Sequence, residues 1–582
     1  MPRVKSMYPD VPPWPGANYH DIVMNRPELR EYPNYTLHID GITGERRRLR
    51  EYIERVADGA TALGTEIEAG GLGLRAEDGH FVGILSENCL DYPVIVFSLL
   101  KIATPMALIP SLLTPGEVVA LLKLSKVTHL FVGPNLLKLA RSAAREIGLP
   151  EDKIFIIGGQ VPGKTSFGDL IEVVRTKKVA RVHSRPVKED TVAYMVFSSG
   201  TSGLPKGVLA SHKNIYVMMA QISATSLAMA RIYTPPPPDT PEKIPVTLCV
   251  LPTYHVMGLH TFVMRLLLAP GTVVILPKWI VDRVADVIPK YTVTQMPMVP
   301  AMAHHLMTHP KLMNVDLSGM VKMNSGAAYL PPELRDRLAS RAPNLLDFGE
   351  GYGMSESTVA IAVLAFPGVF PHAERVSGMT GVLLPSMEAR ILRDDGSEAD
   401  FDEPGELLVR GGNVVLGYKD NDKANRETFL EGGWLRTGDR FKIDKQGRFF
   451  FVDRIKDTLK ISGTQVSPSE IESTLLQHSG GLIDDVAVAG VPLPSSRFTD
   501  ELSPHAWVVL SAKGRQRGQD AVFQELEGWV RARLSKPKWL RGGFQVVVEI
   551  PKLPTGKVLR RKLQEEYLRA AKLKESDVRA KL

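Results

Sequence analysis

Short apolar runs rich in β-branched residues alternate along the chain with longer segments of helical character. A run that is apolar at nearly every position is typical of a strand buried on both faces of a sheet. Segments such as PELRDRLASRA, residues 332–342, have a helical pattern instead. The alternation predicts an α/β fold, with strands at 80–85, 128–133, 153–159, 246–251, 272–276 and 389–392.

The longest apolar stretch, residues 92–113, is interrupted by Lys101, Pro105 and Pro110. These breaks favour a buried helix followed by a turn over a membrane span. The first residues, MPRVKSMYPDVPPWPG, lack the apolar core of a secretory signal, so the chain is expected to begin inside the cell. The proline-rich stretch 233–243 predicts a surface excursion.

The pattern changes after about Asp453, where the charged segment DRIKD leads into a compact α/β stretch. This change predicts a domain boundary, with a large domain at 1–454 and a small one at 455–582. The sequence SPSEIESTLLQ predicts a capped helix, with Ser467 or Ser469 as the cap and Glu470 or Glu472 reaching back.

Composition narrows the class of protein. The chain has 582 residues, is 44% hydrophobic and 23% charged, and carries a formal charge of +7. These values indicate a multidomain globular protein without an integral membrane segment. The mixed charges give little support for a nucleic-acid partner. The two cysteines, Cys89 and Cys249, lie in apolar surroundings and are expected to pack in the core of a reduced protein.

Two glycine-rich loops are candidates for the nucleotide-binding site. GGQVPGKT, residues 158–165, has the letters of a phosphate-binding loop, but Pro162 removes a backbone donor and no acidic partner is near. We therefore expect Lys164 to have no role in catalysis. The rival loop follows an apolar strand and offers glycines, hydroxyls and a lysine for a polyphosphate: Ser198, Ser199, Gly200, Thr201, Ser202, Gly203 and Lys206.

This second loop resembles the signature of the acyl-adenylate-forming superfamily, which includes acyl-CoA synthetases and 4-coumarate-CoA ligases. The resemblance continues in order through LPTYHVMGL, NSGAAYL, GEGYGMSEST, GWLRTGD, DRIKDTLKISGTQVSPSEIE and LPTGKVLRRKL. It implies a large domain of several mixed sheets and a small mobile α+β domain. The implied reaction joins a carboxylic acid to CoA through acyl-AMP, with ATP and Mg²⁺.

The resemblance also implies roles for single residues. Glu356 would bind Mg²⁺, and Ser355, where the family usually has threonine, would contact the α-phosphate. Asp439 and Arg454 would hold the ribose. The remaining nucleotide-binding positions would be Gly326, Ala327, Ala328, Glu350, Gly351, Tyr352 and Gly353.

In the small domain, Lys557 resembles the lysine that neutralises charge during adenylation. Lys456 falls at the family's hinge, and after a domain rotation Lys460 and Gln465 would act in the second step. Ser462 and Gly463 would border the CoA tunnel. His255 completes the set of expected catalytic residues.

A mostly apolar set of residues is expected to line the acid pocket, which favours an aromatic (phenylacetate- or cinnamate-like) or medium-chain acid: Met257, Thr261, Met298, Val359 and Ala360. The chain reads Tyr329-Leu330-Pro331-Pro332 where 4-coumarate-CoA ligases have Pro-Leu-Gly-Lys, which argues against 4-hydroxycinnamate. Transfer to a separate carrier protein and a P-loop NTPase remain alternatives. The final tripeptide Ala580-Lys581-Leu582 is close to a peroxisomal signal, so an import receptor is a possible partner, with a cytoplasmic location as the alternative.

Overall fold

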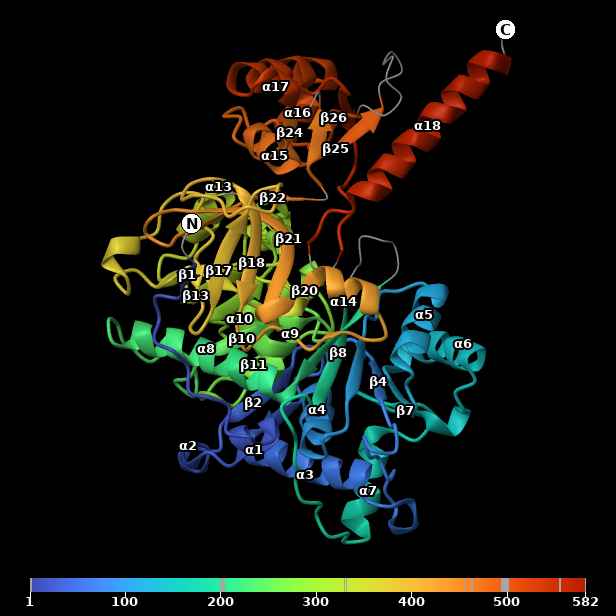
Figure 1. Ribbon diagram of the computed structural model, residues 1–582. Coiled ribbons are helices and arrows are strands. Elements are labelled where there is room, and N and C mark those ends of the chain that lie inside the picture. Colours follow the sequence, from blue (N-terminus) through green and yellow to red (C-terminus); the bar gives the residue numbers. More distant parts are fainter. Residues whose placement is uncertain are drawn as a thin grey trace.

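The computed structural model confirms the expected α/β fold. It describes residues 3–198, 205–328, 330, 332–455, 457–461, 464–492, 502–553 and 556–580, with the backbone alone at 460, 464, 465 and 571–580. Three sheets occupy the chain up to Arg454, and two small sheets follow it. In Figure 1 the later part sits above the large body, and α18 (Arg560–Ala580) extends away from it.

A nine-stranded sheet forms the centre of the large body, in the order β16-β15-β14-β13-β12-β10-β11-β2-β3. Its strands from β14 through β2 run parallel, so their carboxyl ends meet at one edge. The strands are β2 (Thr36–Asp40), β3 (Arg46–Arg48), β10 (Val246–Cys249), β11 (Thr272–Ile275), β12 (Gln295–Met298), β13 (Lys322–Ser325), β14 (Asp347–Tyr352), β15 (Ala362–Val363) and β16 (Val382–Leu383).

A seven-stranded sheet lies beside it, in the order β19-β9-β8-β5-β4-β6-β7. The long apolar stretch at 92–113 contains the predicted buried helix, α4 (Tyr92–Lys101). The same stretch continues into the buried strand β5, which the sequence did not predict. The strands are β4 (Val82–Leu85), β5 (Met106–Ile109), β6 (His129–Val132), β7 (Ile154–Ile156), β8 (Val192–Ser198), β9 (Lys206–Ser211) and β19 (Gly417–Tyr418).

A third, antiparallel sheet has the order β1-β17-β18-β21-β20, with β22 paired to β21. Its strands are β1 (Val4–Lys5), β17 (Glu388–Leu392), β18 (Gly405–Arg410), β20 (Phe429–Leu430), β21 (Trp434–Ile443) and β22 (Phe449–Arg454). The helices of the large body are α1 (Tyr19–Met24), α2 (Pro27–Glu31), α3 (Leu49–Gly64), α5 (Pro115–Ser125), α6 (Leu137–Ile147), α7 (Phe167–Thr176), α8 (His212–Ala230), α9 (Val256–Leu259), α10 (Val281–Lys290), α11 (Pro300–Thr308), α12 (Pro310–Met313), α13 (Pro332–Ser340) and α14 (Asp422–Thr428).

After Arg454 the chain forms a hairpin, β23 (Leu459–Ile461) and β24 (Thr464–Val466), and a sheet of β25 (Ile483–Pro492), β26 (Leu502–Leu510) and β27 (Phe544–Val546). These strands together with α15 (Pro468–Leu476) and α17 (Gln519–Arg533) bury a separate apolar cluster, and α16 (Ala512–Arg517) connects β26 to α17. Ser467 caps α15, while the Glu472 carboxylate instead binds Val488 and Arg560. A moving domain with a hinge at Lys456 stays a prediction, because Lys456 lies outside the described residues.

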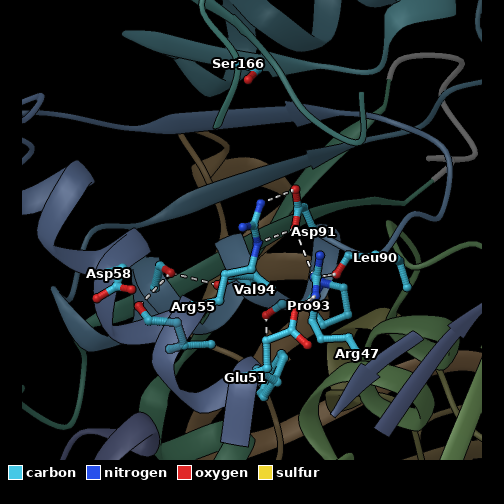
Figure 2. Close-up of polar contacts among 12 residues, drawn as sticks. Arg47, Glu51, Arg55, Asp58, Leu90, Asp91, Pro93, Val94 and Ser166 are labelled. Carbon is cyan, nitrogen blue, oxygen red and sulfur yellow. Dashed lines mark hydrogen bonds and ion pairs between the residues drawn. The ribbon is translucent and has the colours of Figure 1, made fainter. Parts of the chain in front are cut away.

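A buried charge cluster joins two sheets at the start of α4 (Figure 2). Asp91 accepts hydrogen bonds from Arg55 of α3 at 2.9 and 3.0 Å and pairs with Arg47 of β3 at 2.9 Å. Burial opposes ionisation of Asp91, yet Arg55 and Arg47 hold its pKa below the ordinary value. Because β3 belongs to the nine-stranded sheet and α4 follows a strand of the seven-stranded one, the cluster fixes the two sheets together.

Both cysteines are free, as expected, and burial raises the pKa of Cys89 to about 12. The stretch 233–243 has no helix or strand and is largely exposed, also as expected. Within the described part of the chain, no helix has both the length and the apolar character that a bilayer crossing needs.

Candidate functional site

A cavity of about 1750 Å³, the central cavity, lies where the three sheets meet. Its lining comes from both parts of the chain, from Lys206 on β9 to Lys557 beyond β27. The segments after β13 and β14, at the carboxyl edge of the nine-stranded sheet, form one wall. Ligands of α/β proteins bind at such an edge, so this cavity is the candidate active site.

A carboxylate, a cation and an aromatic hydroxyl lie together in the wall of the cavity. Asp439 on β21 lies opposite Arg454 on β22, with 3.7 Å between their charged atoms. Its other oxygen accepts a hydrogen bond of 2.7 Å from the Tyr352 hydroxyl. Burial raises the pKa of Asp439, and Arg454 opposes this. The result is an oriented carboxylate beside an aromatic ring and a cation.

A second carboxylate lines the same cavity. Glu356 is 5% exposed and accepts a 2.8 Å hydrogen bond from the hydroxyl of Tyr418 on β19. The Lys206 ammonium lies 4.5 Å from the centre of the Tyr418 ring. Among the described residues no cluster of three His, Cys, Asp or Glu could hold a metal. A single carboxylate suits Mg²⁺, which takes one or two protein carboxylates together with substrate phosphates.

Lys557 enters the cavity from the later part of the chain. It closes a tight turn in which Leu553 donates its N–H to the Lys557 carbonyl at 2.8 Å. Gly556 in this turn has φ +81° and packs against Val299 of the large body, where a β-carbon would stand 3.4 Å from Val299. Burial and the nearby Arg454 lower the pKa of Lys557. A cation with a lowered pKa is thus held close to Asp439.

Four of the five residues predicted for the acid pocket line the central cavity, together with His255. Burial lowers the pKa of His255 to about 4, so its ring is neutral at pH 7. Gly353 is required here, because a β-carbon would stand 1.9 Å from the Val359 carbonyl oxygen. The predicted residues that line the cavity are His255, Met257, Thr261, Val359 and Ala360.

Met298 does not line the cavity, and its predicted place in the acid pocket is wrong. Strand residues alternate between the two faces of a sheet. On β12, Gln295 and Pro297 face the cavity, whereas Met296 and Met298 are fully buried in the core. Ala328 is likewise absent from the lining. The other predicted nucleotide residues that are described line the cavity: Ser198, Lys206, Gly326, Ala327, Glu350, Gly351, Tyr352, Gly353, Ser355, Asp439 and Arg454.

Several predicted residues lie outside the described part of the structure. Only the backbone of Lys460 and Gln465 is described, and the two are register partners across the β23–β24 hairpin. The residues not described are Ser199, Gly200, Thr201, Ser202, Gly203, Lys456, Ser462 and Gly463.

The competing loop at 158–165 is a surface turn away from the central cavity. Its Lys164 ammonium binds the Glu151 carboxylate at 2.6 Å and the Glu151 carbonyl at 2.9 Å. None of its residues lines the cavity. The lysine that a phosphate would need is therefore already paired.

Sequence reasoning missed three functional candidates in the cavity: Tyr418, Arg265 and Lys322. The sequence around Tyr418 contains no pattern that predicts a place in the site, because its strand has only two residues and lies far along the chain from Glu356. Arg265 did give one, as a single cation inside the apolar run TFVMRLLL.

Comparison with known proteins confirms the resemblance stated from the motifs. Residues 47–419 match the family described as AMP-binding enzyme. The chain is 32% identical to 4-coumarate--CoA ligase-like 4 of Oryza sativa subsp. japonica, over 90% of this chain and 89% of that one. It is 31% identical to acyl-CoA ligase AKT1 of Alternaria alternata, over 84% and 83% of the two chains.

The solved structure of the anthranilate CoA ligase AuaEII with anthranoyl-AMP has a similar fold. Its TM-score is 0.78 at 24% identity, covering 96% of this chain and 99% of that one. The chain belongs to the AMP-binding enzyme family. It is an enzyme of the ligase class, in the group of the acyl-CoA and 4-coumarate-CoA ligase-like proteins.

Proposed function

We propose that this enzyme activates a carboxylic acid with ATP, releasing pyrophosphate, and passes the acyl group from acyl-AMP to CoA. The observation that carries the proposal is the convergence of Lys557, Asp439 and Glu356 on one cavity. Relatives that are named CoA ligases support the choice of acceptor. The apolar lining around Met257 favours an aromatic or medium-chain acid.

The proposed first step joins two anions, so charge neutralisation is its main requirement. Asp439 and Arg454 would hold the ribose, and the flat face of Tyr352 would border the base. Glu356 would hold Mg²⁺, which supplies positive charge to the phosphates when bound. Lys557 would bring a second positive charge to the acid and the α-phosphate, while His255, neutral at pH 7, would line the acid pocket.

The proposed second step needs a different arrangement of the small domain. The Lys557 turn contacts the large body near Val299, which suits the first step. A rotation about Lys456 would withdraw this turn and bring the hairpin of Lys460 and Gln465 toward the cavity. The proposed domains are 1–454 and 455–582.

A panel of aromatic and aliphatic acids, assayed for pyrophosphate release with and without CoA, tests the proposal. Mass detection then identifies the product. Acid-dependent pyrophosphate release with acyl-CoA as product is expected. Full turnover without CoA would favour another acceptor such as a carrier protein, and orthophosphate release without any acid would contradict acid activation.

Two lysine variants separate this proposal from a P-loop NTPase. Lys206→Ala removes a cation from the cavity and is expected to weaken the use of ATP by roughly tenfold or more. Lys164→Ala is the matched control, because Lys164 binds Glu151 away from the cavity, and it is expected to leave the rates unchanged. The reverse order of effects would favour the loop at 158–165.

A peroxisomal location is a separate part of the proposal. It is suggested by the tripeptide 580–582, and the relative at 29% identity named peroxisomal OPC-8:0-CoA ligase 1, of Arabidopsis thaliana, lends it support. Imaging a fluorescent protein fused ahead of the intact chain, with Lys581→Glu as the comparison, tests it. Equal diffuse signals from both would contradict it.

A further inference from the structure

Two cations line the central cavity without an ion-pair partner among the described residues. Arg265, which follows the π-helical segment His260–Met264, and Lys322, the first residue of β13, form no side-chain hydrogen bond or ion pair there. The nearest acidic neighbour of Lys322, Asp347, is occupied by Arg375 at 2.8 Å. At this part of the cavity wall the two cations therefore have no direct counter-charge from the described side chains.

Burial lowers the pKa of both Arg265 and Lys322, and the positive charge of Arg265 lowers that of Lys322 further. Both residues are half-buried, and a cation that has lost part of its water without gaining a counter-charge is destabilised. Apolar side chains of similar volume would fill the same wall at less cost. The two cations are thus placed to bind a negatively charged group of the ligand.

Lys322 is part of a polar row across the sheet. Gln295 on β12 and Asp347 on β14 are its register partners, and Thr247 on β10 is the partner of Gln295. All four side chains line the cavity, and the Thr247 hydroxyl donates to the Gln295 amide oxygen at 3.3 Å. A row of polar groups on four neighbouring strands is a prepared surface for a polar group of the ligand.

The strand length sets the distance between this row and the proposed reaction centre. Lys322 begins β13, and Gly326 follows its last residue at the edge where the nucleotide is expected. At about 3.3 Å per residue, four residues separate the two levels by roughly 13 Å. The Lys322 side chain can extend toward the level of Gly326, which shortens this distance. An acid with one polar group at the reaction centre and a second beside the Lys322 ammonium would therefore have the two groups on the order of 10 Å apart.

We infer that the pocket selects acids with a second carboxylate about 10 Å from the activated one, and that Lys322 and Arg265 bind this second carboxylate. In an extended chain that spacing corresponds to roughly eight bonds. The substrate class is thus a medium-chain dicarboxylic acid or an aromatic acid with a distal carboxylate. This inference rests on the proposed acid-activating function.

Matched acids test the inference on the full chain with ATP and CoA. Octanedioic, nonanedioic and decanedioic acids are compared with the monocarboxylic acids of equal length and with the monomethyl esters of the diacids. The measured quantity is kcat/KM from pyrophosphate release. We expect each diacid to exceed its monocarboxylic and ester partners by roughly tenfold to a hundredfold.

Variants then assign the preference to the two cations. Lys322→Met and Arg265→Met are expected to remove most of the diacid preference, and Lys322→Arg to keep it. Lys322→Gln, which retains a polar group on the strand, serves if Lys322→Met does not fold. Lys138→Met, an exposed lysine on α6 without an ion-pair partner among the described residues, is the control and should keep the preference.

The outcomes distinguish the two proposals. Equal use of diacids and monoacids by the unaltered enzyme, or a preference that survives in both Lys322→Met and Arg265→Met, would overturn the inference and leave acid activation standing. Pyrophosphate release with none of the acids, including the wider panel, would overturn the proposed function as well.

Discussion

The hydroxyl of Tyr418 offers a sharp test of the phosphate end of the cavity. Tyr418→Phe removes the donor that lies 2.8 Å from the Glu356 carboxylate but keeps the ring under Lys206. The ring stays in place because Asn425 binds both the N–H and the carbonyl of residue 418, at 2.7 and 2.9 Å. The substitution therefore changes one hydrogen bond to a buried charge.

A hydrogen bond to a charged group contributes about 1.5–3 kcal/mol, which corresponds to roughly a tenfold to hundredfold change in a rate or binding constant. We expect kcat/KM for ATP to fall by this factor in Tyr418→Phe, and a higher Mg²⁺ concentration to be needed at fixed ATP. Pyrophosphate release measured over a range of Mg²⁺ checks both. Tyr233→Phe is the control, since Tyr233 is exposed and stacks on Phe366. An unchanged kcat/KM in Tyr418→Phe, with thermal unfolding also unchanged, would refute the reasoning.

Three further predictions concern the small domain, the buried ion pairs and acid stability. Lys557→Ala is expected to abolish acyl-AMP formation yet spare CoA transfer to supplied acyl-AMP; equal loss of both half-reactions would contradict the proposed rotation. Asp91→Asn leaves Arg47 and Arg55 without their shared anion and is expected to destabilise the fold by about 3–5 kcal/mol in chemical unfolding, while Asn in place of the exposed Asp78 should change little. His38 is fully buried, both its ring nitrogens lack a partner in the described structure, and burial lowers its pKa to about 3. At a pH between this value and about 6.5, the ordinary pKa of histidine, His38 binds a proton in the unfolded chain but not in the folded one. The free energy of unfolding therefore falls as the pH drops through this range. His38→Met should therefore raise the unfolding temperature more at pH about 5.5 than at pH about 7.5, and an equal change at both would contradict it.

The strands and the polar motifs could be predicted from the sequence because each has a local signal. The apolar run at 246–251 contains β10, and the motif residues Tyr352 and Asp439 meet in the cavity although they lie far apart in sequence. The catalytic and binding roles of these residues remain predictions.

The prediction for Met298 failed because the local sequence does not determine which face of the sheet a strand residue points to. In QMPM the apolar residues occupy both faces of β12, so the pattern could not show that Met298 faces the core. Lys322 was not singled out from the sequence, because one lysine in GMVKMNSG carries no local signal of a binding role. Its place in a row across four strands depends on register, which pairs residues that are distant in the sequence.

Lys322 and Asn324 both line the cavity from β13, so in the inferred binding mode their positions along this strand would set the length of the acid. Side chains of one strand return to the same face only at every second residue, so a cation on β13 can move toward the reaction centre only in steps of about 7 Å. Asn324 occupies the next such position on that strand. If Lys322 binds a distal carboxylate as inferred, exchanging the residues at 322 and 324 would shorten the preferred acid by one such step, and related enzymes with a cation elsewhere on this strand would differ in acid length by increments of several bonds.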